Sequence, residues 1–144
     1  MKEQLIAFET ARLAKEKGFN WKVRCHYRDG HAYTKELICG GSLYNMNSHE
    51  EQELWITNLY SAPTQGLLQK WLREVRGIHI TIDHVDNTTE FYYDYSVVNR
   101  NNREYQDEDM TDQAKRINHY TKEYQFDTFE EALEIALQEA LKLI

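Results

Sequence analysis

Alternation of apolar and polar residues predicts a first β-hairpin near the start of the chain. Residues 21–28 carry apolar or aromatic side chains at odd positions and basic side chains at even positions, a period typical of a half-buried strand. Asp29-Gly30 then predicts a turn. We expect a three-residue loop at 29–31 rather than a two-residue one, because its register matches apolar with apolar and basic with acidic side chains. The matched pairs are Val23 with Leu37, Tyr27 with Tyr33, and Arg24 with Glu36.

A second hairpin is predicted from residues 78–85 and 90–98, which flank a polar turn at 86–89. One face of this hairpin is apolar and the other polar, as in an antiparallel sheet with one side in water. The apolar pairs are Ile78 with Val97, Ile80 with Tyr95, Ile82 with Tyr93, and His84 with Phe91. The polar pairs are His79 with Ser96, Thr81 with Asp94, and Asp83 with Tyr92.

Two helices are predicted in the first half of the chain. Residues 3–17 are rich in good helix formers and end at Gly18, where a C′ glycine belongs. The second helix has Ser61 as its N-cap and Pro63 in its first turn, where a missing N–H is tolerated, and it ends at Gly77. Its apolar stripe consists of Leu67, Leu68, Trp71, Leu72 and Val75.

The last third of the chain ends in a clearly patterned helix. Thr128 and Glu131 form a capping box before it. We expect a mobile polar loop near residues 99–110 and a short helix between Thr111 and Glu123. The apolar face of the final helix consists of Phe129, Ala132, Leu133, Ala136, Leu137, Ala140, Leu141 and Ile144.

These elements predict one α+β domain over residues 1–144, of order α-ββ-α-ββ-α, with antiparallel hairpins packed against helices. Ten Tyr, five Phe and three Trp exclude a disordered chain. No apolar stretch approaches the roughly 20 residues that a bilayer span needs. The first residues lack the apolar core of a secretory signal, so we expect a cytoplasmic location. In that compartment Cys25 and Cys39 are expected to be buried, reduced thiols.

The net charge of −7 is unevenly distributed along the chain. Residues 1–103 hold 13 basic and 13 acidic side chains, whereas residues 104–144 hold 4 basic and 11 acidic ones. The acidic excess argues against general nucleic-acid binding, but a neutral first part can still carry a local basic patch.

Three blocks of the sequence support a resemblance. The first lies at residues 5–19, the second at 60–65, 68–74 and 78–80, and the third at 129–134 and 137–141. The middle block, with Tyr60-Ser61-Ala62-Pro63-Thr64-Gln65, is the most specific. Together they cover under a third of the chain, which in these blocks resembles an uncharacterised family of small proteins encoded by phages and prophages of gut Bacteroidales. The resemblance implies a phage or mobile-element setting and carries over no catalytic residue.

The strongest candidate binding feature is positive charge in two rows, one on the first strand and one on the second helix. Arg offers a planar fork of donors and Lys a point charge, so either row could hold a phosphate-bearing ligand. The alternative is that both rows are solvated surface. The rows are Lys22, Arg24, His26 and Arg28, and Lys70, Arg73 and Arg76.

A second candidate is the polar face of the second hairpin. There the expected register places His79 diagonally across from Asp94, which could form a His–carboxylate pair for general-base work, with Asp83 and Tyr92 nearby. Exposed sheet faces commonly carry such residues without a catalytic role. The sequence shows no paired metal-ligand spacing, no glycine-rich phosphate loop and no known catalytic motif, and it implies no cofactor.

The favoured hypothesis is a non-enzymatic phage accessory protein, such as an antagonist of host defence, that acts by binding. Its partner would be a host protein or an anionic small molecule such as a nucleotide, in the cytoplasm of an infected or lysogenic bacterium, with a homo-oligomer as one expected form. Two alternatives stay open. One is a small hydrolase or nuclease using His79 and Asp94, and the other is acidic mimicry of nucleic acid by residues 104–144.

Overall fold

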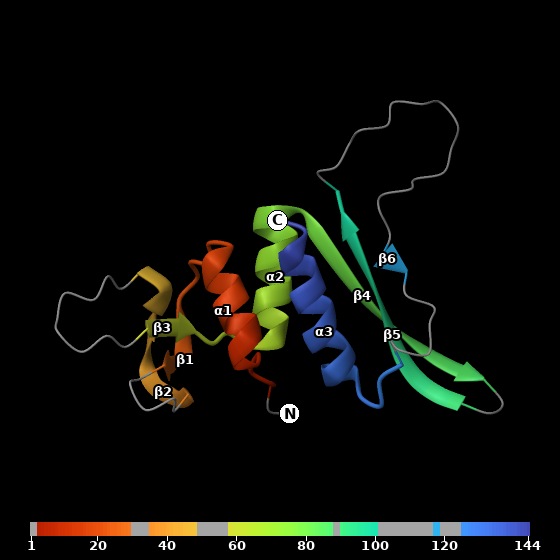
Figure 1. The fold of residues 1–144 in the computed structure, drawn as a ribbon, viewed down its shortest axis with the longest axis horizontal. Coiled ribbons are helices and arrows are strands. Elements are labelled where there is room, and N and C mark those ends of the chain that lie inside the picture. The colour runs from red at the N-terminus through yellow and green to blue at the C-terminus, as the bar shows by residue number, and fades with distance from the viewer. Residues whose placement is uncertain (1–2, 30–34, 49–57, 88–89, 101–116, 119–124) are drawn as a thin grey trace. The chain divides into compact units, whose positions relative to one another are not determined.

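The computed structural model describes residues 3–29, 35–48, 58–87, 90–100, 117–118 and 125–144. Within these ranges the chain is an α+β protein, as predicted, with three α-helices and six strands (Figure 1). None of the helices in these ranges is both long and apolar enough to cross a membrane. The elements are α1 (Phe8–Glu16), β1 (Val23–Asp29), β2 (Lys35–Tyr44), the 3-10 turn η1 (Met46–Ser48), β3 (Asn58–Ser61), α2 (Gln65–Arg76), β4 (Ile78–Asn87), β5 (Glu90–Asn99), β6 (Ile117–Asn118) and α3 (Phe129–Lys142).

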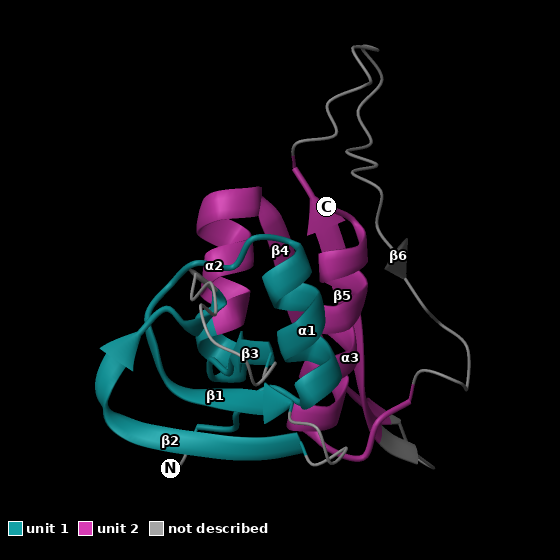
Figure 2. Cartoon of the chain, turned by 60° about the vertical axis from the view of Figure 1, so that its left-hand side comes forward, with its two compact units in different colours: residues 1–67 teal, residues 68–144 magenta. Residues whose placement is uncertain are grey.

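The chain divides into two compact units, Met1–Leu67 and Leu68–Ile144 (Figure 2). Within the described residues each unit contains one antiparallel sheet, with strand order β2-β1-β3 in unit 1 and β4-β5-β6 in unit 2. Strands β3 and β6 were not predicted. The expected helix over 111–123 is wrong at Ile117–Asn118, which pair with β5, and its other residues lie outside the described ranges. The predicted mobile loop near 99–110 also lies outside them beyond Arg100.

Helix α1 begins at Phe8, five residues later than the helix predicted over residues 3–17 from their content of good helix formers. The preceding segment is extended and pairs with the chain before α2: the Ile6 N–H donates to the Pro63 carbonyl at 3.1 Å, and the Gln65 N–H donates to the Gln4 carbonyl at 2.9 Å. Tertiary hydrogen bonds therefore replace the helical ones that local propensity favours. The predicted end is confirmed, because Gly18 has a φ of 82°, a conformation that glycine adopts without strain.

The hairpin of β1 and β2 forms, but in a different register. Cys25 lies opposite Cys39 and Arg28 lies opposite Glu36, four residues away from the expected alignment. The reason is the connection: β1 ends at Asp29 and β2 begins at Lys35, so it is longer than the expected three-residue loop. The ion pair predicted for Arg24 is made instead by Arg28, which contacts Glu36. A basic side chain does lie opposite an acidic one in the hairpin, as predicted, but the longer loop changes which basic residue it is.

The register of β4 and β5 also differs from the prediction, by two residues. His79 lies opposite Val98 and Asp83 opposite Asp94, because the strands continue to Asn87 and restart at Glu90. The expected four-residue turn is replaced by a two-residue connection. A shift of two preserves which side chains share a face, so the predicted apolar face is retained.

The apolar face of unit 2 is covered by α3, which packs on β4 and β5. The predicted cap is confirmed, since the Glu131 N–H donates to the Thr128 hydroxyl at 3.2 Å. Phe129 is an exception to the predicted stripe, because 44% of it is exposed. The buried face of α3 consists of Ala132, Leu133, Ala136, Leu137, Ala140 and Leu141.

Helix α2 begins at Gln65, four residues after the predicted N-cap. Ser61 belongs to β3, and the Leu67 N–H donates to the Thr64 hydroxyl at 3.3 Å, so Thr64 does the capping. Gly77 ends the helix as predicted, with a φ of 65°. Trp71 is fully buried, whereas Val75 is 51% exposed, so the predicted stripe is one turn too long.

Candidate functional site

Basic side chains from three elements of unit 2 gather at the turn between α2 and β4. Arg73 and Arg76 lie in the last turn of α2, and His79 follows at the start of β4. The Arg100 N–H donates to the Gly77 carbonyl at 3.0 Å, which ties the end of β5 to the same turn. We call Arg73, Arg76, His79 and Arg100 the turn cluster. Arg100 was not among the predicted binding residues, because it lies in the segment predicted to be a polar loop.

The charges of the turn cluster are close enough to affect one another. The pKa of His79 is lowered from its ordinary value, first by burial and then by the positive charges of Arg100 and Arg73. The neutral imidazole is thus favoured while the guanidinium groups stay charged. An anion placed among these groups would relieve their mutual repulsion.

The arginines of the turn cluster differ in their partners. The Arg76 guanidinium lies 5.2 Å from the centre of the Trp71 ring, a cation–π contact that holds it against the helix. Arg73 and Arg100 are exposed, and no carboxylate of the described residues forms an ion pair with either. Lys70, also predicted in this row, lies 3.9 Å from the Glu74 carboxylate. The guanidinium N–H groups of Arg73 and Arg100 are therefore the hydrogen-bond donors of the turn cluster that a ligand would meet.

The basic row of unit 1 is partly neutralised. Lys22 lies just before β1 and Arg24 lies at an irregularity of the β1–β2 ladder, and both are exposed. Arg28 is paired with Glu36. His26 is half-buried in the central strand, and its pKa is lowered by burial and by the charge of Arg28. Two of the four predicted residues in this row thus keep an exposed, unpaired charge among the described residues.

Two other lysines of unit 1 contact the rings of Tyr60 and Phe8, which pack against each other. These contacts were not predicted from the sequence. The Lys15 ammonium lies 5.0 Å from the Tyr60 ring centre and donates to the Leu59 carbonyl at 2.8 Å. The Lys35 ammonium lies 4.2 Å from the Phe8 ring centre and 3.1 Å from a Glu9 carboxylate oxygen. The hydrogen bond from the Lys35 ammonium, together with its charge, lowers the pKa of Glu9. These lysines serve packing within unit 1, which leaves the turn cluster as the stronger anion candidate.

The proposed His79–Asp94 catalytic pair is not brought together. His79 faces Val98, and Asp94 lies four residues further along β5, which is roughly 14 Å away at about 3.4 Å per residue. The Asp94 carboxylate accepts the Tyr95 N–H at 2.7 Å. Asp83 faces Asp94, and Tyr92 faces Val85. The His–carboxylate pair that this hypothesis assigns to His79 and Asp94 is therefore not formed.

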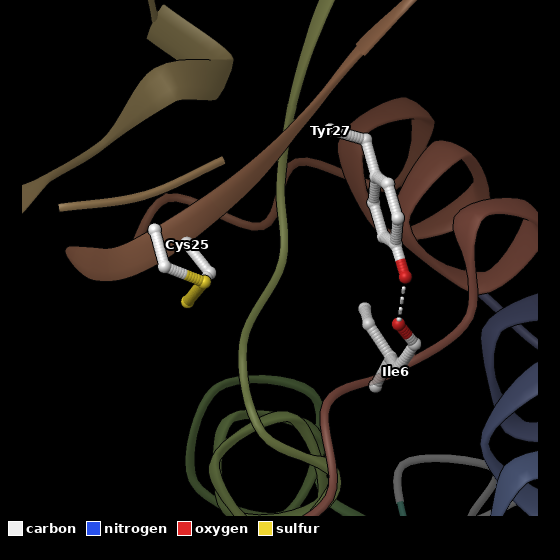
Figure 3. The surroundings of a disulfide bond; sticks show 4 residues. Ile6, Cys25 and Tyr27 are labelled. Atoms are coloured by element: carbon white, nitrogen blue, oxygen red, sulfur yellow. Dashed lines mark hydrogen bonds between the residues drawn. A yellow bond between two sulfur atoms is a disulfide. The ribbon is translucent and has the colours of Figure 1, made fainter. Parts of the chain in front are cut away.

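The cysteines are not reduced, which corrects the prediction. Cys25 and Cys39 form a disulfide that links β1 to β2, with their Cα atoms 4.1 Å apart. They are not buried either, because Cys25 is half-buried and Cys39 is exposed. Figure 3 shows Cys25 and Tyr27 on the same strand, with the Tyr27 hydroxyl donating to the Ile6 carbonyl at 2.9 Å. The true register places the two cysteines directly opposite each other, which the predicted register did not.

Two further features bear on function, namely the acidic stretch at residues 104–144 and the arrangement of residues that could bind a metal ion. Much of 104–144 lies outside the described residues, and in α3 the Glu139 carboxylate is paired with Lys142 at 2.7 Å. The described ranges contain no group of three or more His, Cys, Asp or Glu side chains arranged to hold a metal ion. No family model, curated protein or solved structure matches this chain.

The lowered pKa of His79 predicts how stability depends on pH. As pH falls below about 6.5, the unfolded chain protonates this histidine before the folded protein does, so acidification is expected to lower the free energy of unfolding. The loss ends once pH is below the folded pKa. Urea denaturation of wild type and His79→Gln between about pH 7.5 and pH 5 measures it.

His79→Gln is expected to flatten the pH profile in part, because the pKa of His26 is also lowered and remains. Adding His26→Gln should flatten the profile further. An unchanged slope in His79→Gln would contradict the lowered pKa of His79 in the folded protein.

Proposed function

We propose that this protein is a phage or mobile-element accessory protein that acts by binding, and that the turn cluster holds an anionic, phosphate-bearing small molecule of the nucleotide class. The observation that carries the proposal is the convergence at one turn of Arg73 from α2, His79 from β4 and Arg100, which directly follows β5. The phage setting rests on the resemblance described above. We place the protein in the cytoplasm of the infected or lysogenic host, where nucleotides are available.

A phosphate fits this cluster on physical grounds. Arg73 and Arg100 have exposed guanidinium groups, and such groups bind phosphate oxygens through paired, charge-assisted hydrogen bonds. His79 could add a third donor after taking up a proton, because a bound anion raises the pKa of a neighbouring imidazole. Binding is therefore expected to be tighter below about pH 6.5.

The charge of the whole chain favours a small ligand over nucleic acid. With a net charge of −7, the protein repels extended polyanions at long range. A compact ligand that reaches only the turn cluster avoids most of that repulsion. A local anion site agrees with the favoured hypothesis from the sequence, in which the protein binds an anionic small molecule.

A host protein is the second candidate partner. Strand β2 is an edge of its sheet within the described residues, and it carries three exposed large apolar side chains, Leu37, Leu43 and Tyr44. Unpaired edges and exposed apolar side chains are common features of protein-binding surfaces. The hydrolase alternative has less support, because His79 and Asp94 lie apart.

Thermal denaturation in the presence of ATP, GTP and cyclic nucleotides tests the proposed ligand class. A nucleotide present at 100 times its dissociation constant is expected to stabilise the protein by about 2.7 kcal/mol. Titration calorimetry with the nucleotide that gives the largest shift then measures the variants. Arg73→Gln and Arg100→Gln should each weaken binding by about 10- to 100-fold, the effect of losing one hydrogen bond between charged groups.

The matched control is Arg12→Gln, which removes the same charge from α1. Arg12 is already paired with Glu9 at 3.2 Å and Glu16 at 3.5 Å, so its loss should change nucleotide affinity less than about twofold. Absence of stabilisation by every nucleotide would refute the ligand class. Equal weakening by Arg12→Gln would show that net charge, and not the turn cluster, is responsible.

A further inference from the structure

The disulfide of unit 1 is accessible from solvent on one side. Cys39 lies on β2, an edge strand among the described residues, and is exposed, whereas Cys25 lies on the central strand β1 and is half-buried. A thiolate must reach a disulfide sulfur to react with it, and exposed disulfides are the labile, exchangeable ones. Because Cys39 is the more exposed residue of the pair, we expect its sulfur to be the one that a thiolate reaches.

The disulfide also stands at the boundary between a regular and an irregular part of the β1–β2 ladder. From Asp29↔Lys35 to Cys25↔Cys39 the residues pair in unbroken succession. The next pair is Val23↔Tyr44, so residues 40–43 of β2 pass a single residue of β1, Arg24. Apart from the glycine itself and its two chain neighbours, no heavy atom of the described residues lies within 4 Å of the place where a Cβ would stand at Gly40 or Gly41. Packing thus contributes little to holding this part of β2.

Beyond Tyr44 the chain is anchored again. The Asn47 side chain donates to the Phe19 carbonyl at 2.9 Å and accepts the Ser61 N–H at 2.9 Å. The Met46 N–H donates to the Ser61 hydroxyl at 3.1 Å. On the other side, the Arg28–Glu36 pair belongs to the regular ladder. Segment 40–44 therefore runs between two anchors, the disulfide and η1.

We infer that Cys25–Cys39 is a reversible exchange site for small thiols, that Cys39 is the sulfur attacked, and that opening the bond loosens β2 over residues 40–44 only. The regular ladder and η1 keep their own hydrogen bonds, so the loosening stops at both ends. Cytoplasmic disulfides are usually transient or redox-sensing, which is the behaviour that such a site would have. The exchange site lies in unit 1 and does not depend on the ligand proposed for unit 2.

The exchange takes two steps with a monothiol such as glutathione. Its thiolate attacks the Cys39 sulfur, the bond between the two cysteine sulfurs breaks, and Cys25 leaves as a thiolate that takes up a proton. A second thiolate attacks the outer sulfur of the mixed disulfide and releases Cys39, which is protonated in turn. The products are two protein thiols and one glutathione disulfide, so two electrons pass from the thiols to the protein.

The test combines thiol trapping with amide hydrogen exchange. The folded protein is treated with dithiothreitol without denaturant, alkylated and examined by mass spectrometry, and we expect both cysteines to be modified. Removing the reductant and adding oxidised glutathione should restore the disulfide. In the reduced protein, amide exchange over 40–44 should accelerate by roughly tenfold or more, with much smaller changes over 35–38 and 46–48.

Single-cysteine variants test which of the two cysteine positions is more accessible to a small thiol reagent. With oxidised glutathione, Cys25→Ser should form a mixed disulfide at Cys39 faster than Cys39→Ser forms one at Cys25, because Cys39 is more exposed. The double variant Cys25→Ser, Cys39→Ser should show the loosened segment and no response to dithiothreitol. If that variant does not fold, amide exchange of the oxidised and reduced wild-type protein still tests whether opening the disulfide loosens residues 40–44.

Three outcomes would overturn the inference. The disulfide could resist dithiothreitol until the protein is unfolded. Reduction could leave the amide exchange of 40–44 unchanged, or accelerate exchange equally throughout β1 and β2. Faster reaction at Cys25 than at Cys39 would overturn the assignment of the attacked sulfur.

Discussion

Replacing Leu137 with alanine is expected to lower the free energy of unfolding by about 2 to 5 kcal/mol. Leu137 is fully buried on α3, the helix that packs on β4 and β5. Truncation removes buried apolar surface and leaves a cavity that a helix docked on a sheet can only partly close. Urea denaturation followed by circular dichroism measures the loss, and amide exchange over β4 and β5 locates it.

Lys142→Ala is the matched control on the same helix. Lys142 is exposed and pairs with Glu139 at 2.7 Å, and exposed ion pairs contribute about 0 to 1 kcal/mol. A Leu137→Ala variant no less stable than Lys142→Ala would mean that α3 does not cover the core of unit 2.

Removing the disulfide is expected to have the second largest effect. Cys25→Ser combined with Cys39→Ser should lower the free energy of unfolding by about 3 kcal/mol, the value expected for a loop of about 15 residues. The two cysteines are 14 residues apart in sequence. Most of this change arises in the unfolded chain, which gains conformational freedom when the link is absent. Denaturation of the wild-type protein with and without dithiothreitol gives an independent measurement.

Ser42→Ala serves as the control for the disulfide variants, because Ser42 is exposed on β2 between the same two anchors. Its effect should stay within about 0.5 kcal/mol. Nucleotide affinity is a second readout and should not change in the cysteine variants, because Arg73, His79 and Arg100 belong to unit 2. If reduction leaves the free energy of unfolding unchanged, the disulfide does not restrict the unfolded chain as expected.

Features that depend on residues close in sequence were predicted well. The cap at Thr128, the buried face of α3 and the helix-ending glycines Gly18 and Gly77 all follow from local periodicity and backbone preference. The apolar face of the β4–β5 hairpin was also correct, because a register shift of two residues leaves each side chain on its face.

Features that depend on loop length were predicted poorly. Both hairpins had the wrong register, since a short sequence window does not show how many residues a connection uses. The register error hid the disulfide, which needs Cys25 opposite Cys39. It also created the apparent His79–Asp94 pair. The start of α1 failed for a related reason, because its first residues pair with a distant segment.

The sequence by itself determined the α+β class, the ends of the helices, the polar and apolar faces and the presence of basic rows, because each depends on periodicity or on the preferences of single residues. Only the tertiary structure decided which charges remain available. It paired Arg28 with Glu36, stacked Arg76 on Trp71 and brought Arg100 to the turn beside His79. Those contacts join residues far apart in the chain, and strand register and helix docking place them.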